Sequence, residues 1–271
     1  MLRFLFHEPK RTDDGQIREA NEAIRRYSSR LHRYKAVLPE HKQKQHRLHV
    51  RSISFLDALN EIEQSLYCSS RYARYVKSSY IDEMKPEELD HYRRYLYFYK
   101  NALIRVFSIL DKLGYFLNDV YNVRTETKKP RFSFYTVLRQ MHEQNIHPEL
   151  GQQLHDLKVT MKPAMDKLRK RRNMEIHFVN VEMLDDLMQN YSPIGERIQV
   201  EQVLEDILDL EQGFQMVCSS ISIAFIYMDR HHPLGLTEGE KDERRTEGSL
   251  NYRQRQRTWK EDSPDSGGRR L

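Results

Sequence analysis

The chain has 271 residues, enough for one sizeable domain or two small ones, and 38% of them are hydrophobic, which suffices for a packed core and excludes disorder throughout. Only 10 Gly and 9 Pro interrupt long stretches rich in Leu, Glu, Arg and Gln, a composition that favours helices over a turn-rich β architecture. The formal net charge of +5 is compatible with a nucleic-acid partner but does not require one.

Cysteine usage and the apolar runs indicate a soluble, cytoplasmic protein. Cys68 and Cys218 each lie in an apolar helical pattern without metal-ligand spacing, which is typical of small buried residues in a reducing compartment. The N-terminal residues lack the pattern of a signal peptide. The longest apolar run, residues 220–228, is shorter than the roughly 18 residues that a membrane span needs.

Apolar residues that recur at three- and four-residue steps predict a series of helices. The most hydrophobic of them starts at Pro86, because proline suits the first turn of a helix and the acidic residues behind it suit the helix dipole. This helix is the expected centre of the core. The predicted helices cover residues 17–37, 45–76 and 86–123, a short segment capped by Ser133, another from Pro148, one from around Pro163, and residues 200–229.

We therefore expect an all-α protein made of three parts: an N-terminal helical extension over residues 1–44, a helical bundle over residues 45–232, and a disordered mixed-charge tail over residues 233–271. The chain contains no internal repeat, Gly-rich phosphate loop, HExxH motif or paired CxxC motif, which excludes several enzyme classes. No metal or cofactor is predicted.

The sequence RKRRNMEIHF is the best candidate for chemistry. Asn173 and His177 are four residues apart and share a helix face, while Arg172 lies roughly 140° round the helix from His177 and can still reach the same space. A titratable imidazole, a fixed cation and an amide are components for metal-free phosphodiester cleavage. Spacing alone is weak evidence, however, because Arg25 and Arg26 precede His32 at a similar distance. On spacing alone, a solvated basic helix face with a hydrogen-bonded histidine explains the motif equally simply.

The segment RNMEIH resembles the R-N-x(3)-H motif of the HEPN superfamily (higher eukaryotes and prokaryotes nucleotide-binding domains). Upstream, ALIRVFSILDKLGYFLNDVYNV followed by RFSFYTVL resembles a HEPN subgroup whose core helix reads close to LDKIAYFLN and leads into an SF-containing segment. The resemblance covers about residues 90–190 and arguably extends to residue 230. It implies an antiparallel bundle of four to five helices that commonly forms homodimers, with the Arg-His motifs of two protomers meeting in a cleft.

Many proteins of this superfamily are metal-independent ribonucleases of toxin-antitoxin, phage-defence or RNA-processing systems. Carried over to this chain, Arg172 matches the motif arginine, Asn173 the polar residue after it, and His177 the catalytic histidine, while Arg171 also fits a looser spacing. The surrounding basic stretch is expected to attract the phosphate backbone of RNA. The predicted RNA-binding residues are Lys167, Arg169, Lys170 and Arg171.

Other polar residues favour structural interpretations. Asp111 and Asn118 interrupt the apolar central helix and are expected to form hydrogen bonds within the bundle. The tyrosines of residues 70–80 and 91–100 are expected to be half-buried rather than free for base stacking. Glu175 faces away from Asn173 and His177 by helical phase, and the His231-His232 pair is expected to interact with a helix C-terminus.

Three functional hypotheses follow. The first is a HEPN-type endoribonuclease with RNA as substrate, a second copy of the chain as partner, and an antitoxin or other protein as a further partner. The second is a non-catalytic helical dimer or adaptor that binds RNA, a nucleotide or a protein. The third is a structural module that recruits another protein through its long helices and tail. An exposed basic cleft lined by Arg172 and His177 favours the first, whereas a packed His177 favours the second.

Overall fold

The computed structural model describes residues 2–33, 39–177, 200 and 202–232, and side chains at 39–41, 176 and 177 lie outside this description. The predicted all-α fold is confirmed. The predicted tail over residues 233–271 and the end of the first predicted helix lie outside the described residues. The helices are α1 (Gly15–Arg33), α2 (Pro39–Ala73), α3 (Pro86–Val120), α4 (Phe134–Glu143), α5 (Pro148–Thr160), α6 (Lys162–His177) and α8 (Val203–His231), with short 3-10 turns at Leu2–Phe6, Ile81–Glu83 and Thr125–Thr127.

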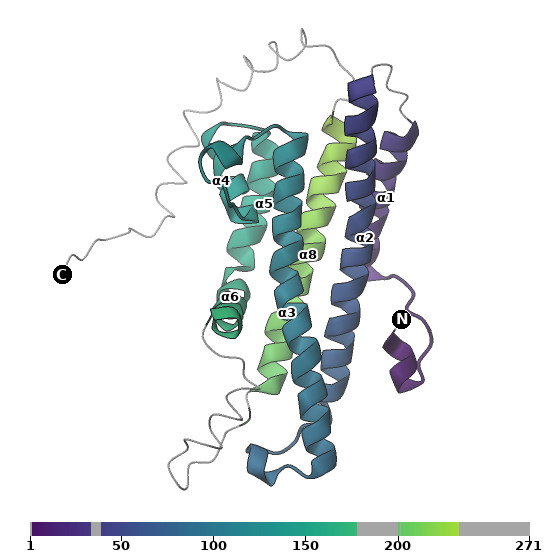
Figure 1. Ribbon diagram of the computed structural model, residues 1–271, viewed down its shortest axis with the longest axis vertical. Helices are drawn as coiled ribbons and strands as arrows, with labels where there is room; N and C mark the ends of the chain where they lie inside the picture. The colour runs from purple at the N-terminus through teal and green to yellow at the C-terminus, as the bar shows by residue number, and fades with distance from the viewer. Residues whose placement is uncertain (1, 34–38, 178–199, 201, 233–271) are drawn as a thin grey trace, which may run out of the picture.

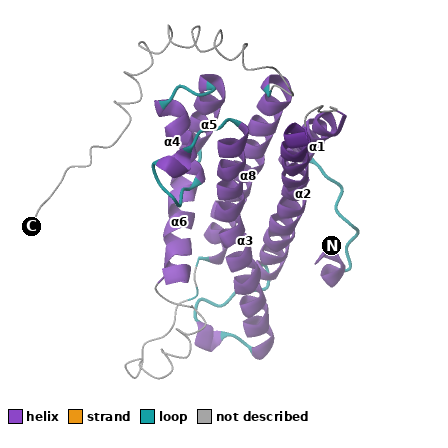
Figure 2. Ribbon diagram, turned by 45° about the horizontal axis from the view of Figure 1, so that its top comes forward, coloured by secondary structure: helices purple, strands orange, loops and turns teal. Residues whose placement is uncertain are grey.

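Long helices α2 and α3 form an antiparallel hairpin, and α8 packs against both of them and against α1 (Figure 1). Ion pairs between the two arms of the hairpin fix its direction: Asp119 near the end of α3 binds Arg51 of α2 at 2.7 Å, and Arg105 binds Glu61. Helices α4, α5 and α6 lie on the opposite side of the bundle from α1, as Figure 2 shows. None of the helices within the described ranges is long and apolar enough to cross a membrane.

The core of the bundle is an aromatic cluster contributed by four helices. The rings of Tyr27, Phe55, Phe116 and Phe225 are fully buried, and their centroids lie 5.5 to 6.4 Å apart in edge-to-face and stacked pairs. Such geometry adds to the free energy gained by burying each ring. These four side chains join α1, α2, α3 and α8 into one core.

Helix α1 is an integral part of this core. Its apolar residues recur at helical spacing, and Ile24, Tyr27 and Leu31 have no exposed surface. They pack against α8 and α2. The predicted boundary between an extension and a bundle at residue 44 stays a prediction, although α1 and α8 already share one hydrophobic interface.

Helix α4 approaches α3 closely, and this contact positions the SF-containing segment. Ser133 caps α4 in a capping box with Thr136, which confirms the predicted helix start. A Cβ atom added to Gly114 of α3 would lie 2.7 Å from the Cα atom of Phe134, so only glycine permits this approach. The Asp111 carboxylate also accepts a 2.9 Å hydrogen bond from the backbone N–H of Phe134.

Candidate functional site

The predicted site lies on α6, a helix with one apolar face and one basic face. Ala164, Met165 and Leu168 are buried against the bundle, chiefly against α8. Lys167 and Lys170 are exposed on the other side. The motif residues follow in the last two turns of the helix, where α6 also contacts α3.

Arg171 is a structural residue. Its guanidinium forms an ion pair with Asp206 of α8, a carboxylate with no exposed surface, and lies 3.5 Å from the Tyr99 hydroxyl of α3. Tyr95 donates a 3.4 Å hydrogen bond to the same carboxylate. A buried carboxylate requires such compensation, so Arg171 joins α6 to α3 and α8.

Arg172, the next residue, has a different environment. Its guanidinium lies over the Phe107 ring, 4.6 Å from the centroid, and donates to the Asn173 side-chain oxygen from Nη2 at 2.8 Å and from Nε at 3.3 Å. Within the part of the chain that the structure describes, no carboxylate forms an ion pair with Arg172. The described contacts of its guanidinium are therefore an aromatic ring and an amide oxygen.

Asp111 is the carboxylate that interacts with Arg172 at longer range. Burial raises the pKa of Asp111, while the hydrogen bond from Phe134 and the charge of Arg172 oppose that rise. Asn118 accepts a 2.9 Å hydrogen bond from the Thr125 backbone and donates to Glu126. The structural interpretation of both residues is therefore confirmed.

The structure describes the side chain of Asn173 but not that of His177. Asn173 is half-buried and holds the Arg172 guanidinium. His177 is the last residue of α6, and its side chain lies outside the described residues, so the shared site of Arg172 and His177 stays a prediction. Glu175 points to α3, where its carboxylate binds Lys100 at 3.1 Å, in agreement with the expected helical phase.

The basic stretch around the motif is partly neutralised. Lys167 binds Asp209 of α8 at 3.3 Å, and Arg169 binds Asp166 at 3.1 Å. Lys170 is exposed and, among described residues, has no ion pair. Sequence reasoning missed the acidic residues of α8, although Asp206 and Asp209 stand in the apolar register of VLEDILDL and so signal buried partners.

Of the two histidines at the end of α8, only His231 interacts with the helix C-terminus as expected. His231 contacts the Tyr227 carbonyl at 3.1 Å, as a residue near a helix C-terminus can. His232 instead is buried, with its Nδ1 atom 2.7 Å from the Tyr27 hydroxyl of α1. Desolvation lowers the pKa of His232 to about 4, and nearby positive charge adds to this effect. The expected burial of tyrosines is confirmed for Tyr92, Tyr95 and Tyr99 of α3, whereas Tyr75 and Tyr97 are exposed.

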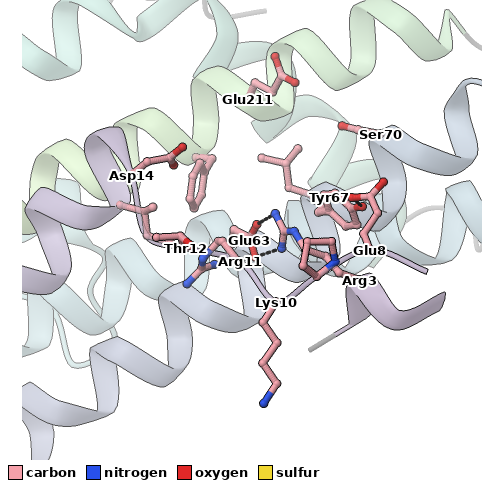
Figure 3. A pocket seen from close by; sticks show the side chains of 14 residues that line it. Arg3, Glu8, Lys10, Arg11, Thr12, Asp14, Glu63, Tyr67, Ser70 and Glu211 are labelled. Carbon is pink, nitrogen blue, oxygen red and sulfur yellow. Dashed lines mark hydrogen bonds and ion pairs between the residues drawn. The ribbon is translucent and has the colours of Figure 1, made fainter. Parts of the chain in front are cut away.

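A pocket of about 600 Å³ lies elsewhere, between the N-terminal segment and helices α1, α2 and α8 (Figure 3). Two of its basic residues are used internally: the Glu63 carboxylate binds Arg3 and Arg11, each at 2.6 Å. Glu8 binds Arg71 at 3.0 Å and accepts a hydrogen bond from Tyr67. These contacts fasten residues 2–14 to α2 and do not resemble an open ligand site. No group of three or more potential metal ligands occurs among the described residues.

The bundle, its central α3 helix and the motif on α6 together define a HEPN-type domain. The family model of the HEPN_Cthe2314-like HEPN family matches residues 52–229, more than half of the chain, and the chain belongs to this family. Comparisons with curated proteins and with solved structures returned no match.

Proposed function

We propose that this protein is a metal-independent endoribonuclease that acts in the cytoplasm as a homodimer, in a toxin-antitoxin or phage-defence setting. The supporting observation is the arrangement of the two adjacent arginines. Arg171 is bound to buried Asp206, whereas the Arg172 guanidinium is held by Phe107 and Asn173 without a carboxylate partner in the described residues. A cation positioned in this way suits a phosphate group.

In the proposed reaction the RNA 2′-oxygen attacks the adjacent phosphorus, a new P–O bond forms, and the bond to the 5′-oxygen breaks. His177 takes the proton from the 2′-hydroxyl or supplies one to the leaving 5′-oxygen. Arg172 stabilises the negative charge on the phosphoryl oxygens, and Asn173 orients Arg172. Two proton transfers are needed, and a second copy of the chain would bring a second imidazole. The products carry a 2′,3′-cyclic phosphate and a 5′-hydroxyl.

The decisive experiment incubates the purified protein with several single-stranded RNAs in the presence of EDTA. We expect cleavage by the parent protein and a loss of at least about a hundredfold in Arg172→Ala and His177→Ala, the usual scale for removing a general acid–base group or a charge stabiliser. Far-UV circular dichroism should remain unchanged. Arg26→Ala and His46→Ala, which replace exposed residues of α1 and α2, are matched controls that should keep full activity.

Two further readouts complete this test. RNA integrity and growth in bacteria that express parent or variant protein show whether cleavage is toxic, and sedimentation velocity gives the oligomeric state. Cleavage that survives in His177→Ala, or that EDTA abolishes, would contradict the proposed mechanism.

The second candidate is a non-catalytic HEPN-like adaptor that binds RNA, a nucleotide or a protein. The ion pairs of Lys167 and Arg169 with neighbouring carboxylates favour it, because they reduce the positive charge around the motif. In that case the parent protein binds a partner but cuts no RNA, and Arg172→Ala changes affinity alone.

A further inference from the structure

A second cationic site lies on the far side of the bundle, in the groove between α1 and α2. A pocket of about 580 Å³ is lined by α1 residues Arg25, Ser28, Ser29, His32 and Arg33, and by α2 residues His49, Ile53 and Leu56. Among the described residues, no aspartate or glutamate lines it. Most of the residues that line the groove precede residue 52, where the family match starts, and so lie outside that match.

The arginines of this groove are available to a ligand. Among described residues, neither Arg25 nor Arg33 forms an ion pair, although Arg25 is close enough to Asp13 and Glu22 to help lower the pKa of each carboxyl. The Arg33 Nε atom donates only a 3.4 Å hydrogen bond to the Ser29 carbonyl. Asp57 and Glu61 of α2 are close enough to Lys112 of α3 to oppose the fall in its pKa that burial causes.

The groove also offers rings and an apolar floor between these cations. The His32 and His49 rings lie 5.5 Å apart, and His49 is held in place by Ser28 at 2.9 Å. Ile53 of α2 is 40% exposed and lies across the groove from the arginines of α1. Arg25 and Arg33 are two helical turns apart, about 12 Å along α1.

We propose that this α1–α2 groove binds single-stranded RNA, with Arg25 and Arg33 contacting two phosphates of one strand and His32 and His49 packing against bases. Cationic walls that follow a backbone, combined with flat side chains on which bases stack, are the recurring design of single-strand sites. Double-stranded nucleic acid does not present free base faces to such rings. The second Arg…His spacing of the chain thereby gains a role in binding, separate from the motif on α6.

The test uses the His177→Ala protein, so that it does not depend on cleavage, and a fluorescein-labelled single-stranded 12-mer RNA as the probe. Arg25→Gln with Arg33→Gln should weaken binding about tenfold or more, as expected when two charge-assisted phosphate contacts are lost. The slope of log Kd against log salt should also become shallower by about 1.4, or about 0.7 for each lost contact. Arg18→Gln with Arg26→Gln removes the same charge from α1 outside the groove and should leave both values nearly unchanged.

Three outcomes would overturn the proposal. They are no affinity of the His177→Ala protein for the probe, an equal loss of affinity in the two double variants, and binding of a polyglutamate peptide as tight as that of RNA. The last result would assign the groove to an acidic protein segment. The groove substitutions are also made in the protein that retains His177, where cleavage can be measured. Loss of binding with intact cleavage at α6, or the reverse, separates this site from the proposed ribonuclease site.

Discussion

Adjacent residues on one helix can have opposite tasks, and Arg171 and Arg172 illustrate this. A step of 100° around α6 turns Arg171 toward the buried carboxylate of Asp206 and Arg172 toward the Phe107 ring. Sequence alone leaves both as candidates for the motif arginine. The structure separates them because a buried charge must be compensated by a neighbour, and Arg171 is that neighbour.

We expect Arg171→Ala to reduce the free energy of unfolding by about 3 kcal/mol, because it leaves Asp206 buried without its cation. Arg172→Ala removes a cation–π contact and should cost about 1 kcal/mol or less. Urea denaturation followed by far-UV circular dichroism measures both. Combining Arg171→Met with Asp206→Leu should recover most of the loss, and a double variant less stable than Arg171→Ala would contradict this account.

For this site, the sequence could predict contacts between neighbouring residues but not contacts with a distant helix. The neighbours Arg172 and Asn173 were predictable as a pair, and the hydrogen bonds between them agree with that interpretation. The partners of Lys167 and Arg171 on α8 were not, because they come from a helix distant in sequence. A charged residue in an apolar register, such as Asp206, indicates a buried partner without identifying it.

At the scale of helices, local signals predicted the starts of α3 and α4. Pro86 and Ser133 begin α3 and α4 as expected, since a first-turn proline and a serine cap act through nearby backbone groups. Helix α2 begins at Pro39, earlier than predicted, for the same reason. Helix α3 ends at Val120 and not at the predicted residue 123. Just beyond this end, Asn122 and Arg124 adopt positive φ values of 49° and 58°, which are not helical.

The α3–α4 contact yields a prediction at this scale. Gly114→Ala should destabilise the protein by about 2 kcal/mol, because overpacking against the Phe134 backbone outweighs the better helix propensity of alanine. Gly151→Ala is the matched control: a Cβ atom there meets nothing within 4 Å, so the change should stabilise α5 by up to about 1 kcal/mol. Thermal unfolding of the two variants distinguishes these effects, and equal shifts in Tm would refute the proposed clash.

At the scale of the whole molecule, the contact between α1 and α8 closes the bundle. His232 follows the end of α8 and meets Tyr27 of α1, and the Arg30 guanidinium donates to the Met228 carbonyl at 3.3 Å. The cluster of charges around His232 includes Arg30, Lys44 and His147. All of them are basic, and no carboxylate is among the groups that shift the pKa of His232. None of these groups therefore stabilises the protonated form of His232.

This arrangement predicts a pH-dependent stability. The pKa of His232 falls from 6.5 to about 4 on folding, so the unfolded chain binds the proton more tightly between these values. Stability should decline by about 3 kcal/mol as the pH falls from about 6.5 to 4, and this contribution is fully present above pH 6.5. Urea denaturation across this range should show a smaller decline for His232→Gln. Parallel pH profiles for the two proteins would show that another group is responsible.

The position of α1 also has a consequence for synthesis of the protein. The apolar face of α1, with Ile24, Tyr27 and Leu31, leaves the ribosome before the rest of the bundle, yet its main partner is α8, the last helix of the described chain. Until α8 is made, that face can be covered only in part, by α2. A nascent chain stalled before residue 203 therefore exposes a hydrophobic surface that invites aggregation or chaperone binding. The bundle can close only when synthesis of nearly the whole matched domain is complete.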